Sequence, residues 1–239
     1  NYFKENVSIA IAGNLSSNIY KLFEEFELSE INAKSTLNIS RPTNPKLNKT
    51  NFSARTGREK VFFDDLEFSR IFMAWRIPSL NDQKKIIGFE ILASILSVGR
   101  NSKFNKALRE EKNLVESIFV DVNSGELGGL FIIEACCNKE DLNLVEKLIN
   151  EIIDEILNYK ILTFEEVTKA VNIVKSNYVF NLETATQLSS FFGNELLWGR
   201  KNSLKNLEKN LEYWNNLNNF REIINLFSKE NFTLIASTN

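Results

Sequence analysis

The sequence predicts an α+β fold, an antiparallel sheet of five to six strands with helices packed on one face. Three observations favour this class. Short β-branched and aromatic runs recur along the chain. Between them lie longer segments with apolar residues three or four positions apart, which is the helical period. The strands are also joined closely enough in sequence to pair antiparallel, with the helices grouped together.

The first predicted elements are a strand and a helix. Val7–Ala12 is short, apolar and β-branched and ends at Gly13-Asn14, which predicts a buried strand that leaves through a turn. Ser16 or Ser17 can cap the following helix, which we expect to end near Glu27.

A basic segment follows this helix. The apolar periodicity fades across residues 29–57, and two of the three prolines, Pro42 and Pro45, lie there. The segment carries basic side chains with almost no acid, and no aromatic ladder or Gly-rich module accompanies them. Such a run is typical of a solvated connector rather than a nucleic-acid site. We therefore predict a linker at 29–57 and an α+β domain at 58–239.

The domain is predicted to open with two strands and two helices. The strands are expected at Lys60–Phe63 and Phe68–Ile77, separated by an acidic turn. Asn81 or Asp82 caps the first helix, and Gly99 ends it. A second helix is expected over about Asn101–Glu111.

A hairpin precedes the remaining helices. Asn123-Ser124-Gly125 lies between two β-rich runs, which predicts a hairpin of residues 114–122 and 127–137. Thr163-Phe164-Glu165-Glu166 forms a capping box at the start of a helix. The later elements are expected as helices at about Asp141–Tyr159, Thr163–Phe180 and Glu183–Trp198, two shorter helices up to Phe227, and a strand at Phe232–Ala236.

The composition excludes several chemistries. The chain has 239 residues, a formal charge of −2 and no His. Most protein zinc sites, Ser-His and Cys-His nucleophiles and neutral-pH proton shuttles use imidazole, so this chain cannot complete them alone. The charge gives no pull toward nucleic acid or anionic membrane, and no apolar run reaches the ~18 residues of a membrane span. The adjacent Cys136 and Cys137 predict no disulfide with each other.

A short internal likeness suggests how the chain is organised. Phe3–Ile9 is similar to Phe227–Leu234, because each places a Lys-Glu-Asn turn before a β-branched strand. In a chain rich in Asn and Lys, this likeness either arises by chance or marks two structural units. The second interpretation makes residues 1–28, a strand plus a helix, the tail of a preceding repeat.

One stretch resembles a known family. Leu96–Val115 contains a glycine, a serine and Leu108-Arg109-Glu110, and it is similar to the "L-R-E-x-x-x-L" stretch of the insulinase or pitrilysin family of zinc peptidases. That family includes mitochondrial processing peptidase and its bacterial relatives. The resemblance extends to an opening hairpin at Phe63–Trp75, a strand at Gly128–Ala135, the helix start at Thr163–Val167, and Trp198-Gly199-Arg200.

The resemblance also implies where the zinc is held. In that family an inverted H-x-x-E-H motif on an early helix of a catalytic first repeat binds the metal. This sequence has no such motif, so it resembles a second, non-catalytic repeat. We expect no catalytic residue, metal ligand or cofactor in this chain, and zinc in a catalytic repeat or partner subunit. Asp64, Asp65 and Glu67 suit a hard cation better than zinc, and we interpret them as a solvated turn.

Arg109 and Glu116 are the candidate substrate-binding residues. Second repeats of the family commonly contribute an Arg and a Tyr that hold the substrate backbone opposite the zinc. The Arg falls on Arg109, whereas the Tyr position, seven residues later, holds Glu116. A phenol donates a hydrogen bond, but an ionised carboxylate only accepts. Either the two form a structural ion pair, which we favour, or the repeat binds peptide by another arrangement. A helix C-terminal cation is an alternative role for Arg109.

The resemblance implies a function and partners. We expect a non-catalytic domain of a processing-protease-like metallopeptidase that helps to close the chamber and bind a peptide substrate, in part by adding a strand to a sheet edge. Its expected partner is the catalytic repeat or subunit, and a homodimer is a further candidate; no nucleic acid and no membrane are expected. We expect a cytoplasmic or periplasmic location. The alternatives are an inactive assembly subunit, like the core proteins of respiratory complexes, and an unrelated α+β interaction domain.

Overall fold

The computed structural model describes residues 8–19, 21, 56–125, 127–158, 160, 162–197, 204–227 and 231–238. These residues fall into two compact units. The smaller unit takes its described residues from 1–51 and 177–203, and the larger takes them from 52–176 and 204–239. Most of the predicted linker, the predicted helix beyond residue 21, most of Phe3–Ile9 and Trp198-Gly199-Arg200 lie outside the described residues.

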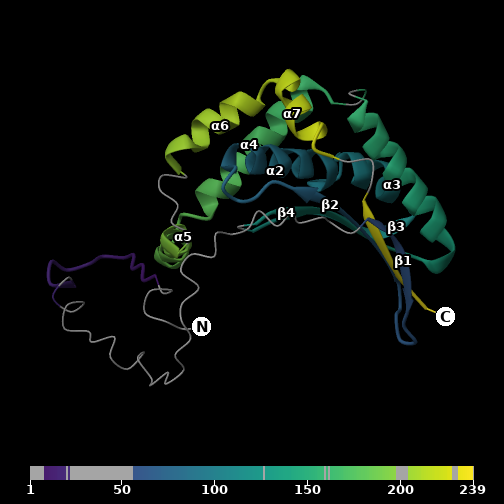
Figure 1. The fold of residues 1–239 in the computed structure, drawn as a ribbon, viewed down its shortest axis with the longest axis horizontal. Helices are drawn as coiled ribbons and strands as arrows, with labels where there is room; N and C mark the ends of the chain where they lie inside the picture. The colour runs from purple at the N-terminus through teal and green to yellow at the C-terminus, as the bar shows by residue number, and fades with distance from the viewer. Residues whose placement is uncertain are drawn as a thin grey trace. The chain divides into compact units, whose positions relative to one another are not determined.

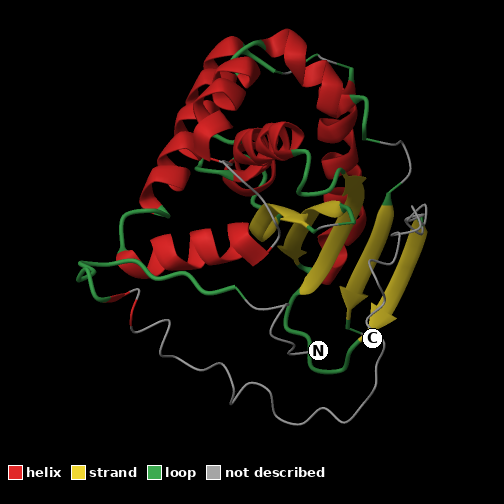
Figure 2. Cartoon of the chain, turned by 60° about the vertical axis from the view of Figure 1, so that its left-hand side comes forward, coloured by secondary structure: helices red, strands yellow, loops and turns green. Residues whose placement is uncertain are grey.

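The larger unit is built on a mixed sheet. Its strands are β1 (Gly57–Phe62), β2 (Ser69–Ile77), β3 (Val115–Ser124), β4 (Gly129–Cys137) and β5 (Phe232–Ser237). They lie in the order β1-β5-β2-β4-β3. β1 runs parallel to β5, and all other neighbouring strands are antiparallel. Figures 1 and 2 show helices of this unit gathered on one side of the sheet, so the predicted α+β class is confirmed.

The position of β5 corrects the predicted pairing. β1 and β2, expected as an opening hairpin, do not pair, because β5 lies between them. β5 buries Ile235 and Ala236, which face opposite sides of the sheet, and this suits an interior strand. β1 carries Arg58, Glu59 and Lys60 and is exposed along most of its length, which suits an edge. Its parallel pairing with β5 makes the sheet mixed rather than wholly antiparallel.

The predicted strand at Val7–Ala12 is not formed over residues 8–12, the part of it that the structure describes. The described residues 8–12 have no regular secondary structure, and Ile9 is 45% exposed. Instead, Ser8 Oγ donates a hydrogen bond of 2.7 Å to the carbonyl of Gly193 in α5 (Ala185–Leu197), within the smaller unit. An apolar run becomes a strand only where a neighbouring strand pairs with its backbone, and none of the described strands does so here.

Side-chain caps fix the starts of two helices where the sequence predicts them. Asp82 caps α2 (Gln83–Ser97), and its carboxylate accepts a hydrogen bond from the Lys85 N–H at 3.3 Å. Thr163 precedes α4 (Phe164–Phe180), and its Oγ1 accepts from the Glu166 N–H at 3.2 Å. The Glu166 carboxylate accepts from the Thr163 N–H in return, at 3.0 Å. The other regular helices are α3 (Leu142–Leu157), α6 (Leu207–Trp214) and α7 (Arg221–Ile224), with short 3-10 turns at Lys139–Asp141, Leu204–Asn206 and Leu217–Phe220.

The helix α2 lies at the centre of the core, in contact with β3, α6 and α7. Trp214 of α6 approaches α2 at Gly88, where a Cβ would come within 2.6 Å of the indole ring. The Trp214 Nε1 donates to the Lys84 carbonyl at 2.7 Å, which fixes this approach. Phe89 of α2 also meets Phe131 of β4, with ring centroids 5.9 Å apart. Because α2 is packed against both the sheet and other helices, its side chains are among the most deeply buried.

Candidate functional site

The candidate site lies where the chain turns from a π-helical segment into β3. This segment, η3 (Asn105–Glu110), is wound more widely than an α-helix, and the Glu111 N–H donates to the Lys106 carbonyl at 3.0 Å. It buries Leu108 completely and leaves Arg109 exposed. The chain then reverses at Asn113, whose φ of 52° is left-handed. Short π-helical segments are frequent at functional sites.

Glu116 occupies a β-bulge at the start of β3. Val115 pairs with Cys137 and Ser117 pairs with Cys136, so Glu116 is the additional residue between two consecutive partners on β4. Its side chain is exposed. A bulge re-aims side chains and interrupts the ladder, and bulges are common next to active sites.

Glu116 lies near a charged patch on β2 and β4. Arg70 and Glu134, one on each strand, form an ion pair with Nη1 and Oε1 2.6 Å apart. Burial raises the pKa of the Cys136 thiol, the Arg70 charge lowers it, and Glu116 and Glu134 raise it further. Glu116 therefore acts electrostatically on the same thiol as Arg70 and Glu134.

Arg109 does not join this patch. Among the ion pairs of the described residues, none links Arg109 to Glu116, so the predicted pair is not observed. Arg109 lies in the last turn of η3, which is the position that the alternative role as a helix C-terminal cation requires. The substrate-binding roles of Arg109 and Glu116 stay predictions.

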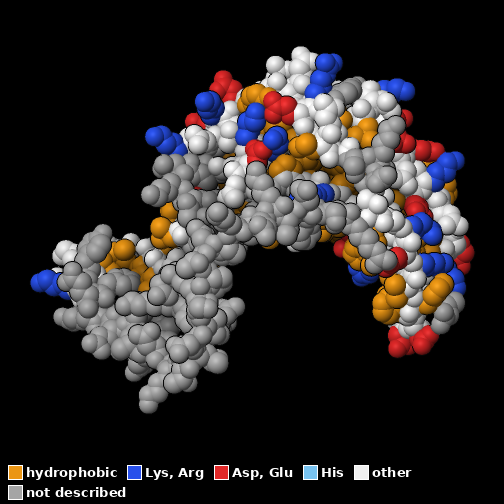
Figure 3. All heavy atoms as spheres, viewed as in Figure 1, with side chains coloured by type: hydrophobic (Ala, Val, Ile, Leu, Met, Phe, Trp, Pro, Cys, Tyr) orange, Lys and Arg blue, Asp and Glu red, His pale blue; other side chains and the backbone are white. Residues whose placement is uncertain are grey.

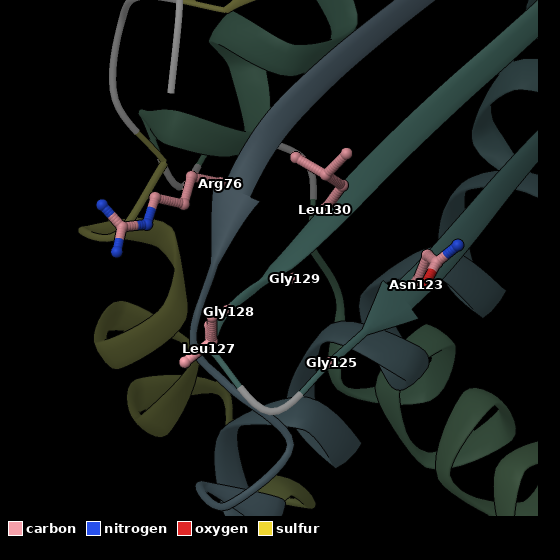
Figure 4. A pocket seen from close by; sticks show the side chains of 7 residues that line it. All are labelled: Arg76, Asn123, Gly125, Leu127, Gly128, Gly129 and Leu130. Atoms are coloured by element: carbon pink, nitrogen blue, oxygen red, sulfur yellow. The ribbon is translucent and has the colours of Figure 1, made fainter. Parts of the chain in front are cut away.

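A cavity of about 290 Å³ lies at the end of the β3–β4 hairpin. Figure 4 shows Arg76 extending from β2 on one side of it and Asn123 from β3 on the other. Gly129 permits the close approach here, because a Cβ would come within 2.7 Å of the Asn123 carbonyl oxygen. The lining residues are Arg76, Asn123, Gly125, Leu127, Gly128, Gly129 and Leu130. Sequence reasoning identifies the turn but not the cavity, and the adjacent Gly128 and Gly129 are its only local signal.

A second cavity, of about 320 Å³, lies between the C-terminal end of α2 and the first turns of α4, and we call it the α2–α4 cavity. Glu166 is one of its lining residues. Burial alone would raise the pKa of the Glu166 carboxyl. Hydrogen bonds from Lys103 and from Thr163 outweigh that effect and hold the pKa of this carboxyl below its usual value. The full lining is Ser94, Ile95, Val98, Asn101, Ser102, Thr163, Glu165, Glu166, Lys169, Ala170 and Ile173.

The residues present do not fit a catalytic zinc. Over the described part of the chain, no group of three or more His, Cys, Asp or Glu could hold a metal ion, and Asp64, Asp65 and Glu67 form no such group. Burial, with the nearby Asp141 and Cys136, raises the pKa of the Cys137 thiol to about 12. This thiol stays protonated at neutral pH, whereas a metal requires the thiolate.

The visible surface mixes both signs of charge. Figure 3 shows Lys and Arg side chains interspersed with Asp and Glu over the helices of the larger unit. Among the described helices, none is long and apolar enough to cross a membrane.

Solved structures share this fold. A protease from Helicobacter pylori superposes with a TM-score of 0.65 at 17% identity, covering 75% of this chain and 43% of that chain. A peptidase M16 inactive domain from Pseudomonas fluorescens gives 0.66 at 14% identity, covering 77% and 44%. A chain of complex III2 from Candida albicans gives 0.65 at 16% identity, covering 77% and 46%. At these identities the likeness establishes the fold alone. This chain spans less than half the length of each of the three matched chains.

The sequence comparisons are more specific. No curated protein matches the chain. Residues 1–174, which are more than half of the chain, match the family model described as the peptidase M16 inactive domain.

Proposed function

Because the chain belongs to the peptidase M16 inactive-domain family, we propose that it is a non-catalytic domain that helps to close a peptide chamber and to bind the peptide substrate. The family match carries this proposal, since it extends from the smaller unit through most of the larger one. Zinc would then be held by a separate catalytic repeat or partner subunit, because this chain contains no His. A peptidase M16 inactive domain is also among the solved structures that share the fold, which agrees with the family match.

The corner between η3 and β3 supplies the proposed peptide contacts. An extended peptide presents both carbonyl oxygens and N–H groups. The guanidinium of Arg109 donates and the carboxylate of Glu116 accepts, so the two exposed side chains can hold one group of each kind. The bulge at Glu116 leaves that residue outside the β3–β4 ladder. The β3 edge is less available further along, because the Val120 N–H donates to Ser97 Oγ at 3.2 Å.

Peptide binding is tested with the full chain and a fluorescent, unfolded peptide, measured by anisotropy. We expect saturable binding that Arg109→Ala weakens about tenfold, the usual effect of losing a charge-assisted hydrogen bond. Arg100→Ala is the matched control. The Arg100 side chain is 89% exposed, and its ion pair with Glu110 is long, at 4.0 Å, so its loss should disturb the fold little. Equal losses in both variants would show unspecific charge attraction and contradict the assignment of Arg109.

The non-catalytic part of the proposal has its own test. The same peptide is incubated with the chain and added zinc, and its fragments are measured by mass spectrometry. No zinc-dependent cleavage is expected. Saturable cleavage that a chelator abolishes would contradict the proposal, whatever the binding assay shows.

A second candidate function is an inactive assembly subunit. Glu116 in place of the expected Tyr favours it, as does its position near Arg70 and Glu134 instead of Arg109. Co-purification separates the two functions. A partner that carries H-x-x-E-H supports the peptide chamber, whereas a multisubunit complex without such a partner supports the assembly role.

A further inference from the structure

Asn105, the first residue of η3, connects this segment to the end of α2. Its Nδ2 donates to the Ser97 carbonyl at 2.7 Å and to Ser102 Oγ at 3.0 Å. A longer contact of 3.3 Å reaches the Gly99 carbonyl. The Ser102 hydroxyl directs its own proton to that carbonyl, at 2.7 Å, so toward Asn105 it can only accept. The Asn105 amide is therefore a donor to three acceptors, and the opposite amide orientation would place its oxygen against two carbonyl oxygens.

Ser97, which accepts the shortest of these bonds, also holds β3. It is the last residue of α2, and its carbonyl is among those that a helix leaves without an internal partner. Its Oγ donates to the Ala93 carbonyl at 3.1 Å and accepts from the Val120 N–H of β3 at 3.2 Å. The end of α2 thus connects to both elements of the proposed peptide site, which are η3 with Arg109 and β3 with Glu116.

The other side chains of η3 hold it less firmly. Leu108 anchors its middle by burial, but apolar burial is not directional. Glu110 and Lys106 form exposed ion pairs of 4.0 and 3.9 Å, and such pairs contribute little. Within the described structure, Asn105 is the residue of η3 whose side chain hydrogen-bonds to another element.

We infer that Asn105 is a positioning residue, which orients η3 so that the Arg109 guanidinium is presented to the peptide. Arg109 lies in the last turn of the same segment. Its long, exposed side chain must be restricted on binding, which costs conformational entropy. A backbone that is already fixed beneath it lowers the total cost of ordering. The inference rests on the proposed contact between Arg109 and the peptide.

The affinity test uses the full chain and the fluorescent, unfolded peptide. Asn105→Ala is expected to weaken binding about threefold or more, as the loss of a hydrogen bond does. Asn105→Asp keeps the size of the side chain but cannot donate when ionised, and it should weaken binding as well. Asn150→Ala is the matched control, because Asn150 Nδ2 donates to the Glu146 carbonyl at 3.0 Å within α3, which carries neither peptide contact. Wild-type affinity in Asn105→Ala, or an equal loss in Asn150→Ala, would overturn the inference.

A double variant shows whether Asn105 acts through Arg109. If it does, adding Asn105→Ala to Arg109→Ala should weaken binding by less than a further factor of about two. Losses that multiply would show that Asn105 acts by another route, and would overturn the inference. Wild-type affinity in Arg109→Ala would overturn the proposed contact and the inference together. A loss in Arg109→Ala with full affinity in Asn105→Ala would overturn the inference alone.

Motion in the free protein gives a readout that does not require a peptide. We expect Asn105→Ala to lower the heteronuclear NOE at the backbone amide and the Nε–H of Arg109, and Asn150→Ala to leave both unchanged. Melting temperatures are measured for the same variants. Unchanged motion at Arg109 would overturn the inference even if Asn105→Ala melted at a lower temperature, because the Asn105 hydrogen bonds would then only stabilise the fold.

Discussion

The two edges of the sheet are held in different ways. At the β3 edge, Val115 and Ile118 are 4% and 2% exposed, and the strand contacts α2 and η3. At the β1 edge, Val61 and Phe62 are 40% and 51% exposed. An ion pair of 3.0 Å between Arg58 and Glu146 connects this strand to α3. One edge is thus part of the core, whereas the other is attached at its surface.

This difference indicates where a binding site can be rigid. Side chains hold a ligand accurately when the elements beneath them are packed. Arg109 and Glu116 are exposed, but each is adjacent in sequence to a buried residue of the β3 edge, Leu108 and Val115. β1 instead presents alternating charges, a common protection of an edge strand against pairing with other chains.

The largest expected effect comes from the core beneath the β3 edge. Leu108 is fully buried, so Leu108→Ala should lower the free energy of unfolding by about 2–5 kcal/mol, measured by urea denaturation. Val61→Ala, on the exposed β1 strand, is the control and should cost far less. Similar losses in the two variants would show that the edges do not differ as described.

The next effect concerns the hydrogen bond that closes the β3 edge. Ser97→Ala leaves the Val120 N–H without its acceptor, and we expect a loss of about 1–3 kcal/mol. Hydrogen exchange at the Val120 amide should become faster, while amides in the middle of β4 keep their rates. Unchanged exchange at Val120 would mean that Ser97 does not protect this edge.

The burial of Cys137, which pairs with Val115 of β3, predicts a pH dependence. Its pKa rises from 9.0 to about 12 in the folded protein, so only the unfolded state ionises between these values. Stability is therefore complete below pH 9 and falls as the pH rises toward 12, by about 1–2 kcal/mol at pH 10. Urea denaturation of wild type and Cys137→Ala measures this, and the variant should lose less stability over this range. If the stability of the wild type and of Cys137→Ala fell equally with pH, the raised pKa of the Cys137 thiol would be contradicted.

The smallest effect is expected at the β1 edge. The hydrogen bonds that Arg58 donates to the Glu146 carboxylate raise the pKa of Arg58, against a smaller effect of burial, yet the Arg58 side chain is half exposed. Exposed ion pairs contribute little, so the coupling energy from a double-mutant cycle of Arg58→Ala and Glu146→Ala should be below about 1 kcal/mol. A larger coupling energy would place β1 among the well-anchored strands.

Local chemistry explains what the sequence could predict. Asp82 caps α2 and the Thr163 to Glu166 box caps α4, because these interactions span only three residues. The Asn123 to Gly125 turn likewise connects two strands that pair with each other. The α+β class follows from the alternation of such locally determined elements.

What the sequence could not predict depends on distant partners. The run from Val7 to Ala12 has the composition of a strand, but its described residues pair with no described strand. The π-helical turn at Arg109 and the bulge at Glu116 have no residue type that signals them, and the bulge becomes visible only in the register between β3 and β4. Ser94 is likewise ordinary in sequence, because serine is common in helices, yet in the described part of the chain its Oγ is buried without a hydrogen-bond partner.

The insertion of β5 has a consequence for the order of assembly during synthesis. Among the described strands, β1 has β5 as its only neighbour, although most of the larger unit separates the two along the chain. While the ribosome is still translating the helices, β2, β3 and β4 can already pair, but β1 must wait for residues 232–237. A premature stop before these residues would remove β5 and leave β1 without its partner, so the sheet would lose two strands rather than one. The edge of β2 would then be open to other nascent chains.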